Sequence, residues 1–145
     1  MQSFDGGRRF VLAALGAFAL ACGMPATAQD PGVSMAKTAA LEWLVIADRK
    51  DAAGTYKAAA QRFRDQITAD RWAEAMKQVQ DQFGAVSERT FVGAKPVEPQ
   101  KGDPQGTFML VGFRTEFAKR KSGQETVTLE RESDGKWRVV GYLMQ

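Results

Sequence analysis

The sequence predicts an α+β fold in which three N-terminal helices pack on a curved four-stranded antiparallel sheet. Two observations lead to this class. Apolar residues recur with a period of about 3.6 from residue 33 to residue 83, and with a period of about 2 after residue 86. Turn signals join the later segments as hairpins, so consecutive strands should pair antiparallel and the helices should cover one face of the sheet.

Three helices are expected before the sheet. The first spans residues 33–48, where small and aromatic side chains recur at helical spacing. The second is N-capped by Asp51, and its apolar face continues to Phe63. The third is capped by Thr68 and ends before Gly84, which stands where a helix stop is expected.

Four strands are expected after Gly84. Their predicted ranges are 86–97, 107–117, 124–132 and 136–144. A long loop rich in proline and glycine separates the first two strands, and residues 118–123 form a basic turn between the second and third. The dipeptide Asp134-Gly135 then supplies the positive φ values of a tight hairpin before the last strand.

The first 28 residues have the pattern of a secretory signal peptide. Arg8 and Arg9 precede an uncharged apolar run, Phe10–Ala21, and a small-residue cleavage site ends at Ala28. The run is too short to span a membrane, which takes about 20 apolar residues. We therefore expect residues 1–28 to be removed, residues 29–145 to form one domain, and the mature protein to be periplasmic or secreted.

Two details of this segment leave alternatives open. The arginine pair also fits a twin-arginine export signal, as well as the ordinary charged start of a signal peptide. The stretch Leu20-Ala-Cys22 loosely resembles a lipoprotein processing site, and processing there would anchor the domain at a lipidated Cys22. The mass of the mature protein distinguishes an N-terminus at Gln29 from a lipidated Cys22.

Composition excludes several kinds of chemistry. The chain has no His, and its one Cys is Cys22, so the usual zinc and copper ligands, a cysteine nucleophile and a Ser-His-Asp triad are absent from residues 29–145. The net charge is only +3, with both signs interspersed, which is not typical of a nucleic-acid-binding protein. We therefore assign no cofactor, no metal ligand and no catalytic residue.

Four sequence motifs lie in the expected domain. They are Ala40-Leu-Glu-Trp43-Leu, Phe63-Arg64 followed by Trp72, Gly84 followed five residues later by Arg89, and Glu125-Thr-Val-Thr-Leu129 followed by Asp134-Gly-x-Trp137-Arg-Val-x-Gly-Tyr142. Together they resemble the small exported bacterial proteins that share domain of unknown function 4019, over roughly residues 39–143. The order of elements is also similar to the cone of nuclear transport factor 2 and ketosteroid-isomerase-like proteins. The resemblance implies a fold and an export history, and it implies no activity.

Glu125 is the carboxylate of greatest interest. Because side chains alternate along a strand, Glu125 shares a face with Val127 and Leu129, and an inward-facing carboxylate needs a partner. Arg89 or Arg114, on the neighbouring strands, can supply one. The residue is then either half of a structural Glu–Arg pair or a desolvated carboxylate in a cavity, serving as general base or polar anchor.

Aromatic residues on the helix stripes form either the core or the wall of a pocket at the mouth of the cone. Such a ligand pocket would be lined by Trp43, Tyr56, Trp72, Arg89, Arg114 and Glu125. Tyr56 is the hydroxyl donor that the helices offer. The other sheet face, with Arg138, Val140 and Tyr142, should meet solvent or a second copy of the chain in a homodimer.

Three functions follow from these observations. The first is a non-enzymatic domain of the cell envelope that binds a partner protein or a small apolar ligand. The second is an enzyme of the ketosteroid-isomerase-like type that uses a single buried carboxylate such as Glu125. The third is a purely structural or assembly protein with a filled core. The size of any cavity between helices and sheet discriminates among them.

Overall fold

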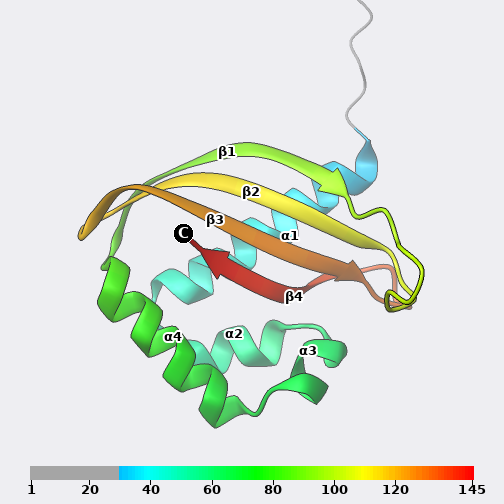
Figure 1. Ribbon diagram of the computed structural model, residues 1–145, viewed down its shortest axis with the longest axis horizontal. Helices are drawn as coiled ribbons and strands as arrows, with labels where there is room; N and C mark the ends of the chain where they lie inside the picture. Colours follow the sequence, from blue (N-terminus) through cyan, green and yellow to red (C-terminus); the bar gives the residue numbers. More distant parts are fainter. Residues whose placement is uncertain (1–29) are drawn as a thin grey trace, which may run out of the picture.

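The computed structural model describes residues 30–145, in which four helices precede a four-stranded sheet (Figure 1). The helices are α1 (Pro31–Asp48), α2 (Ala52–Ala58), α3 (Gln61–Gln66) and α4 (Ala69–Phe83), and the strands are β1 (Val86–Pro96), β2 (Phe108–Phe117), β3 (Arg120–Arg131) and β4 (Trp137–Met144). The strands pair antiparallel in the order β1-β2-β3-β4, and the sheet is not closed. The curved sheet arches over the helices, which all lie on one side of it (Figure 1). The predicted fold class is therefore confirmed.

Residues 1–29 lie outside the part of the chain that the structure describes. The predicted signal peptide and the alternative lipidation site at Cys22 fall in this segment, so both stay predictions. Within residues 30–145, no helix combines the length and the apolar character needed to cross a membrane.

The long helices begin at side-chain caps. The carboxylate of Asp30 accepts a hydrogen bond from the backbone N–H of Gly32, and Pro31 occupies the first turn of α1, where a missing N–H has no consequence. The hydroxyl of Thr68 accepts from the N–H of Arg71 at the start of α4. Gly84 ends α4 with a φ of +79°, a conformation that glycine adopts without strain.

The predicted second helix is wrong in one respect, because it is two helices. Ala59 and Ala60 are extended, fully buried, and separate α2 from α3. The backbone N–H of Ala60 donates to the carbonyl of Val139, at 2.8 Å, on the outer edge of β4. This bond and the burial of two methyl groups outweigh the helix propensity of alanine, which is a weak local preference.

The core lies between the helices and the inner face of the sheet. Alternate residues of β2 and β3 point into it, among them Val111, Phe113, Val127 and Leu129. Small residues of α1 face these strands and let the helix approach closely. The buried side chains of α1 are Ala36, Ala40, Trp43, Leu44 and Ala47.

The predicted basic turn before the third strand is shorter than expected. Strand β3 begins at Arg120, so the turn consists of Ala118 and Lys119. Both residues are tied to the end of the helical layer, because Ala118 donates to the carbonyl of Ala85 and Lys119 to that of Phe83. Pairing of Arg120 with Phe117 then extends the hairpin.

Two β-bulges change which side chains face inward. In β1, Phe91 pairs with Phe113 and Gly93 with Gly112, so Val92 is an extra residue. In β4, Leu129 of β3 pairs with Val139 and Thr128 with Gly141, so Val140 is extra. The second bulge brings Tyr142 to the inner face, where its ring packs on the core. The prediction that Tyr142 lies on the outer face is therefore wrong.

Candidate functional site

Glu125 sits at the centre of a buried polar network. It has no exposed surface, and four donors serve its two carboxylate oxygens. Arg89 donates through Nε to Oε2 at 2.6 Å and through Nη2 to Oε1 at 3.1 Å. The hydroxyls of Thr115 and Tyr142 add one short hydrogen bond each, to Oε2 and Oε1 respectively. The charge of the carboxylate is therefore balanced by Arg89, and its two oxygens accept four hydrogen bonds.

Arg89 connects this carboxylate to the helical layer. Its Nη1 and Nη2 bind the two carboxylate oxygens of Asp48, the last residue of α1, at 2.8 and 2.9 Å. Burial lowers the pKa of the guanidinium, but its hydrogen bonds to Asp48 and Glu125, with their charges, outweigh this and raise the pKa overall. The Arg89 cation also offsets the unfavourable interaction of Asp48 with the negative end of the α1 dipole.

Tyr142 completes the network from β4. Its ring lies edge-on to Trp43, with centroids 5.1 Å apart. Burial raises the pKa of its phenol, and the charge of Glu125 and the hydrogen bond to it raise the pKa further. Tyr142 is therefore a neutral donor to a charged acceptor. Sequence reasoning missed this role, although Gly141, an isolated glycine within a strand, is a signal for the bulge that turns Tyr142 inward.

The interior beside this network has no room for a ligand. The hollow nearest to Asp48 and Tyr142 measures about 40 Å³ and is walled by α4 residues and by Phe117. That volume suits one or two waters, whereas small-molecule sites usually enclose about 300–1,000 Å³. On the inner side of the network, the geometry holds a charge in place and offers no space for a substrate.

The proposed pocket residues on the helices lie in the core. The indole N–H of Trp43 donates to the carbonyl of Thr55, and that of Trp72 donates to the hydroxyl of the same residue. Tyr56 donates to the carbonyls of Arg64 and Ile67, and so fastens α2 to the end of α3 rather than reaching Glu125. Trp43 does approach the network, through Tyr142.

Arg114 lies apart from the other five predicted site residues. It is exposed on the outer face of the sheet, opposite Gln124 of β3, so Arg89 alone provides the Glu125 ion pair. Within residues 30–145 there is also no group of three or more carboxylates placed to hold a metal ion.

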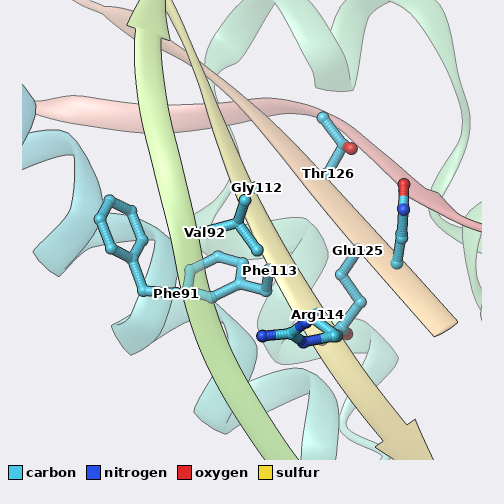
Figure 2. Close-up of a pocket in the computed structure, with 8 residues that line it drawn as sticks. Phe91, Val92, Gly112, Phe113, Arg114, Glu125 and Thr126 are labelled. Carbon is cyan, nitrogen blue, oxygen red and sulfur yellow. The ribbon is translucent and has the colours of Figure 1, made fainter. Parts of the chain in front are cut away.

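A groove crosses the outer face where Arg114 lies. Two adjoining hollows, of about 460 and 640 Å³, share Val92, Gly112, Gln124 and Thr126 as lining residues. Figure 2 shows Val92 of β1 beside Gly112 of β2, with Arg114 two residues farther along β2 and Thr126 on β3. Glu125 borders the groove only from beneath, because it is fully buried on the inner face. We call this feature the outer groove.

The chain belongs to the family described as protein of unknown function DUF4019, whose model matches residues 39–142. The resemblance drawn from the sequence motifs is confirmed. No curated protein sequence matches this chain.

Two solved structures are similar at low identity. A ketosteroid isomerase-like protein from Erwinia carotovora atroseptica is 14% identical, with a TM-score of 0.47, over 79% of this chain and 95% of its own. The helical cell shape determining protein Pgp2 from Campylobacter jejuni is 13% identical, with a TM-score of 0.48, over 72% of this chain; the match spans only 38% of the Pgp2 chain. Similarity at this level transfers no activity to the chain.

Proposed function

We propose that this protein is an exported, non-enzymatic binding domain of the cell envelope, and that a partner protein docks on its outer groove. The observation that carries the proposal is the groove itself, whose two hollows measure about 460 and 640 Å³ and which Arg114 borders. It is open to solvent, has polar and apolar lining, and lies on the face of the sheet that the helices leave uncovered (Figure 1).

The packed interior favours a protein partner over an internally held small apolar ligand. The space beside Glu125 accepts about one or two waters, and the aromatic residues of the helices fill the rest. A partner must therefore bind at the surface. A homodimer through the same face is the alternative occupant, and the experiments below separate the two.

The enzyme alternative has weaker support. A general base needs access to its substrate and a free lone pair, whereas Glu125 is fully buried and accepts four hydrogen bonds. Tyr142, the hydroxyl beside it, already donates to the same carboxylate. Catalysis at Glu125 would require the Arg89 pair to break and the core to open.

The N-terminus and the cellular location of the mature protein test the proposed export. We expect mass spectrometry of protein purified from the producing cells to give an N-terminus at Gln29, in the periplasmic or culture fraction. A membrane-bound form with acyl chains on Cys22 would replace free export with lipid anchoring. A cytoplasmic chain that retains Met1 would contradict the proposal.

Partner docking is tested by photo-crosslinking in the producing cells. A photoreactive residue replaces Val92 in the groove. In a matched control it replaces Glu74, an exposed residue of α4, which lies on the helical side of the molecule (Figure 1). We expect a covalent adduct with another protein at position 92 and none at position 74. Equal labelling at both positions, or no adduct at position 92, would contradict the function. An adduct of twice the chain mass would identify a homodimer instead.

A further inference from the structure

The floor of the outer groove consists of two glycines that face each other across β1 and β2. Gly93 pairs with Gly112, and a Cβ on either residue would meet no atom closer than 3.8 Å. Neither glycine has a positive φ, so the backbone does not require them. Glycine inside a strand weakens it, and often marks a place where a ligand or another chain approaches closely.

Apolar side chains stand on both sides of this floor. Val92, pushed outward by its bulge, is 68% exposed on β1. Leu143 of β4 is 53% exposed and pairs with Thr126, which in turn pairs with Gly112. These two are the most exposed large apolar residues of the described chain. A large apolar side chain lying over the glycines would contact Val92, and Leu143 lies two strands beyond Gly112, on the far side of Thr126.

Two cations bound the groove along the strand direction. Lys95 is level with Leu110, two residues before Gly112, and Arg114 lies two residues after it. The ion pairs of residues 30–145 use other basic side chains, so neither cation is neutralised there. At about 3.3 Å per residue, the two ends are roughly 13 Å apart.

We propose that the outer groove binds an extended segment of a partner protein with the pattern acidic-x-aromatic-x-acidic. In an extended chain, side chains at positions i, i+2 and i+4 project to one side with the same spacing as the groove. The aromatic ring lies on Gly93 and Gly112, and the two carboxylates pair with Lys95 and Arg114. This deepens the proposed function and rests on it.

The acidic pair beyond Arg114 limits the length of this pattern. Glu88 and Glu116 are exposed and directly opposite each other, two residues past Arg114. A further carboxylate on the partner would meet two like charges there, which is unfavourable. The recognised segment is therefore five residues long, with one acidic residue at each end.

A labelled peptide tests the pattern by fluorescence polarisation. The probe is Ser-Glu-Ser-Phe-Ser-Glu-Ser, and the two controls replace both Glu by Lys or the Phe by Ser. We expect saturable binding of the first peptide only, weakening as ionic strength rises. Arg114→Glu should lower the affinity about fivefold or more, and Gly112→Val, which fills the floor, about tenfold or more. The control Lys57→Glu, an exposed charge on α2, should change it less than about twofold.

Defined results overturn the proposal. Equal binding of the Glu and Lys peptides, no binding of the Glu peptide, or binding that survives Arg114→Glu would do so. A dimer in sedimentation that Gly112→Val converts to monomer would identify a second copy as the occupant, which also overturns it. If the position 92 adduct forms while the peptide fails, the docking function stands and only this partner pattern is lost.

Discussion

Glu125 carries a negative charge in a place that water does not reach. Removing one partner from a buried ion pair usually costs about 3–5 kcal/mol, because the other charge stays buried without compensation. Here the loss would leave Arg89 with Asp48 alone and would remove the acceptors of the Thr115 and Tyr142 hydroxyls. In this arrangement, Glu125 contributes to the stability of the fold.

The variant Glu125→Gln tests this at the residue scale. We expect the free energy of unfolding in urea to fall by about 2–4 kcal/mol, since the amide keeps the shape but loses the charge. Crosslinking at position 92 should persist under conditions where the variant is folded. The matched control Glu116→Gln, exposed on the outer face, should change stability by less than about 0.5 kcal/mol. Equal effects of the two variants would contradict a structural role.

Tyr142 makes a second prediction, which concerns pH. Its pKa in the folded protein is raised above the ordinary value of about 10, first by burial and then by Glu125. The folded state therefore keeps a proton that the unfolded state loses, so this contribution to stability is present below about pH 10 and declines above it. Urea unfolding at a series of pH values should show a steeper alkaline loss for the wild type than for Tyr142→Phe. Parallel curves would contradict the raised pKa.

Residue-level reasoning found one ion pair, Arg89 with Glu125, and missed three of its partners, Asp48, Thr115 and Tyr142. Alternation along the strand was enough to place Glu125 inward and to name Arg89 as a candidate. Asp48 could not be found in this way, because its position depends on how α1 ends against the sheet. Tyr142 was placed on the wrong face, since one extra residue in β4 reverses the alternation after it.

At the scale of elements, tertiary packing sets those helix limits that local sequence preferences do not determine. The strands were predictable because alternation and turn residues both act locally. The break between α2 and α3 was not, because it depends on the hydrogen bond from Ala60 to the edge of β4. The helix caps at Asp51 and Thr68 were correctly read, since a cap is a local hydrogen bond.

Two strand glycines make a matched prediction about the sheet. A Cβ on Gly123 would lie 2.5 Å from the buried ring of Phe117 and 3.1 Å from the carbonyl oxygen of Thr115, whereas one on Gly112 would make an ordinary van der Waals contact, 3.8 Å from the carbonyl oxygen of Gly93. We expect Gly123→Ala to lower the free energy of unfolding by about 1–3 kcal/mol through overpacking. Gly112→Ala should leave it unchanged or raise it by up to about 1 kcal/mol. Thermal or urea unfolding measures both, and the reverse order would refute the assignment of the two faces.

At the scale of the whole molecule, one core serves both layers. The three Trp side chains lie in it, Trp43 and Trp72 from the helices and Trp137 from β4. No disulfide supports residues 30–145, because the one cysteine of the chain is Cys22. Packing and the polar network therefore stabilise this part of the molecule.

A shared core predicts cooperative unfolding. Far-ultraviolet circular dichroism, which follows the helices and strands, and tryptophan fluorescence, which follows the core, should give the same urea midpoint. Added reductant should not move the midpoint for protein that begins at Gln29. A helical signal that disappears before the fluorescence changes would mean that the helical layer unfolds separately.

The chain of charges from Asp48 through Arg89 to Glu125 also fixes where α1 lies along the sheet. The face of α1 toward the strands includes Ala36, Ala40 and Ala47, whose small methyl groups resist sliding of the helix little, while Trp43 and Leu44 on the same helix are buried and would lose their contacts. Such a slide, about 5.4 Å, would carry Asp48 out of reach of Arg89 and leave a half-neutralised guanidinium inside the protein. Alanines let α1 lie close to the sheet, and the ion pairs act together with the buried Trp43 and Leu44 to hold it in a single register.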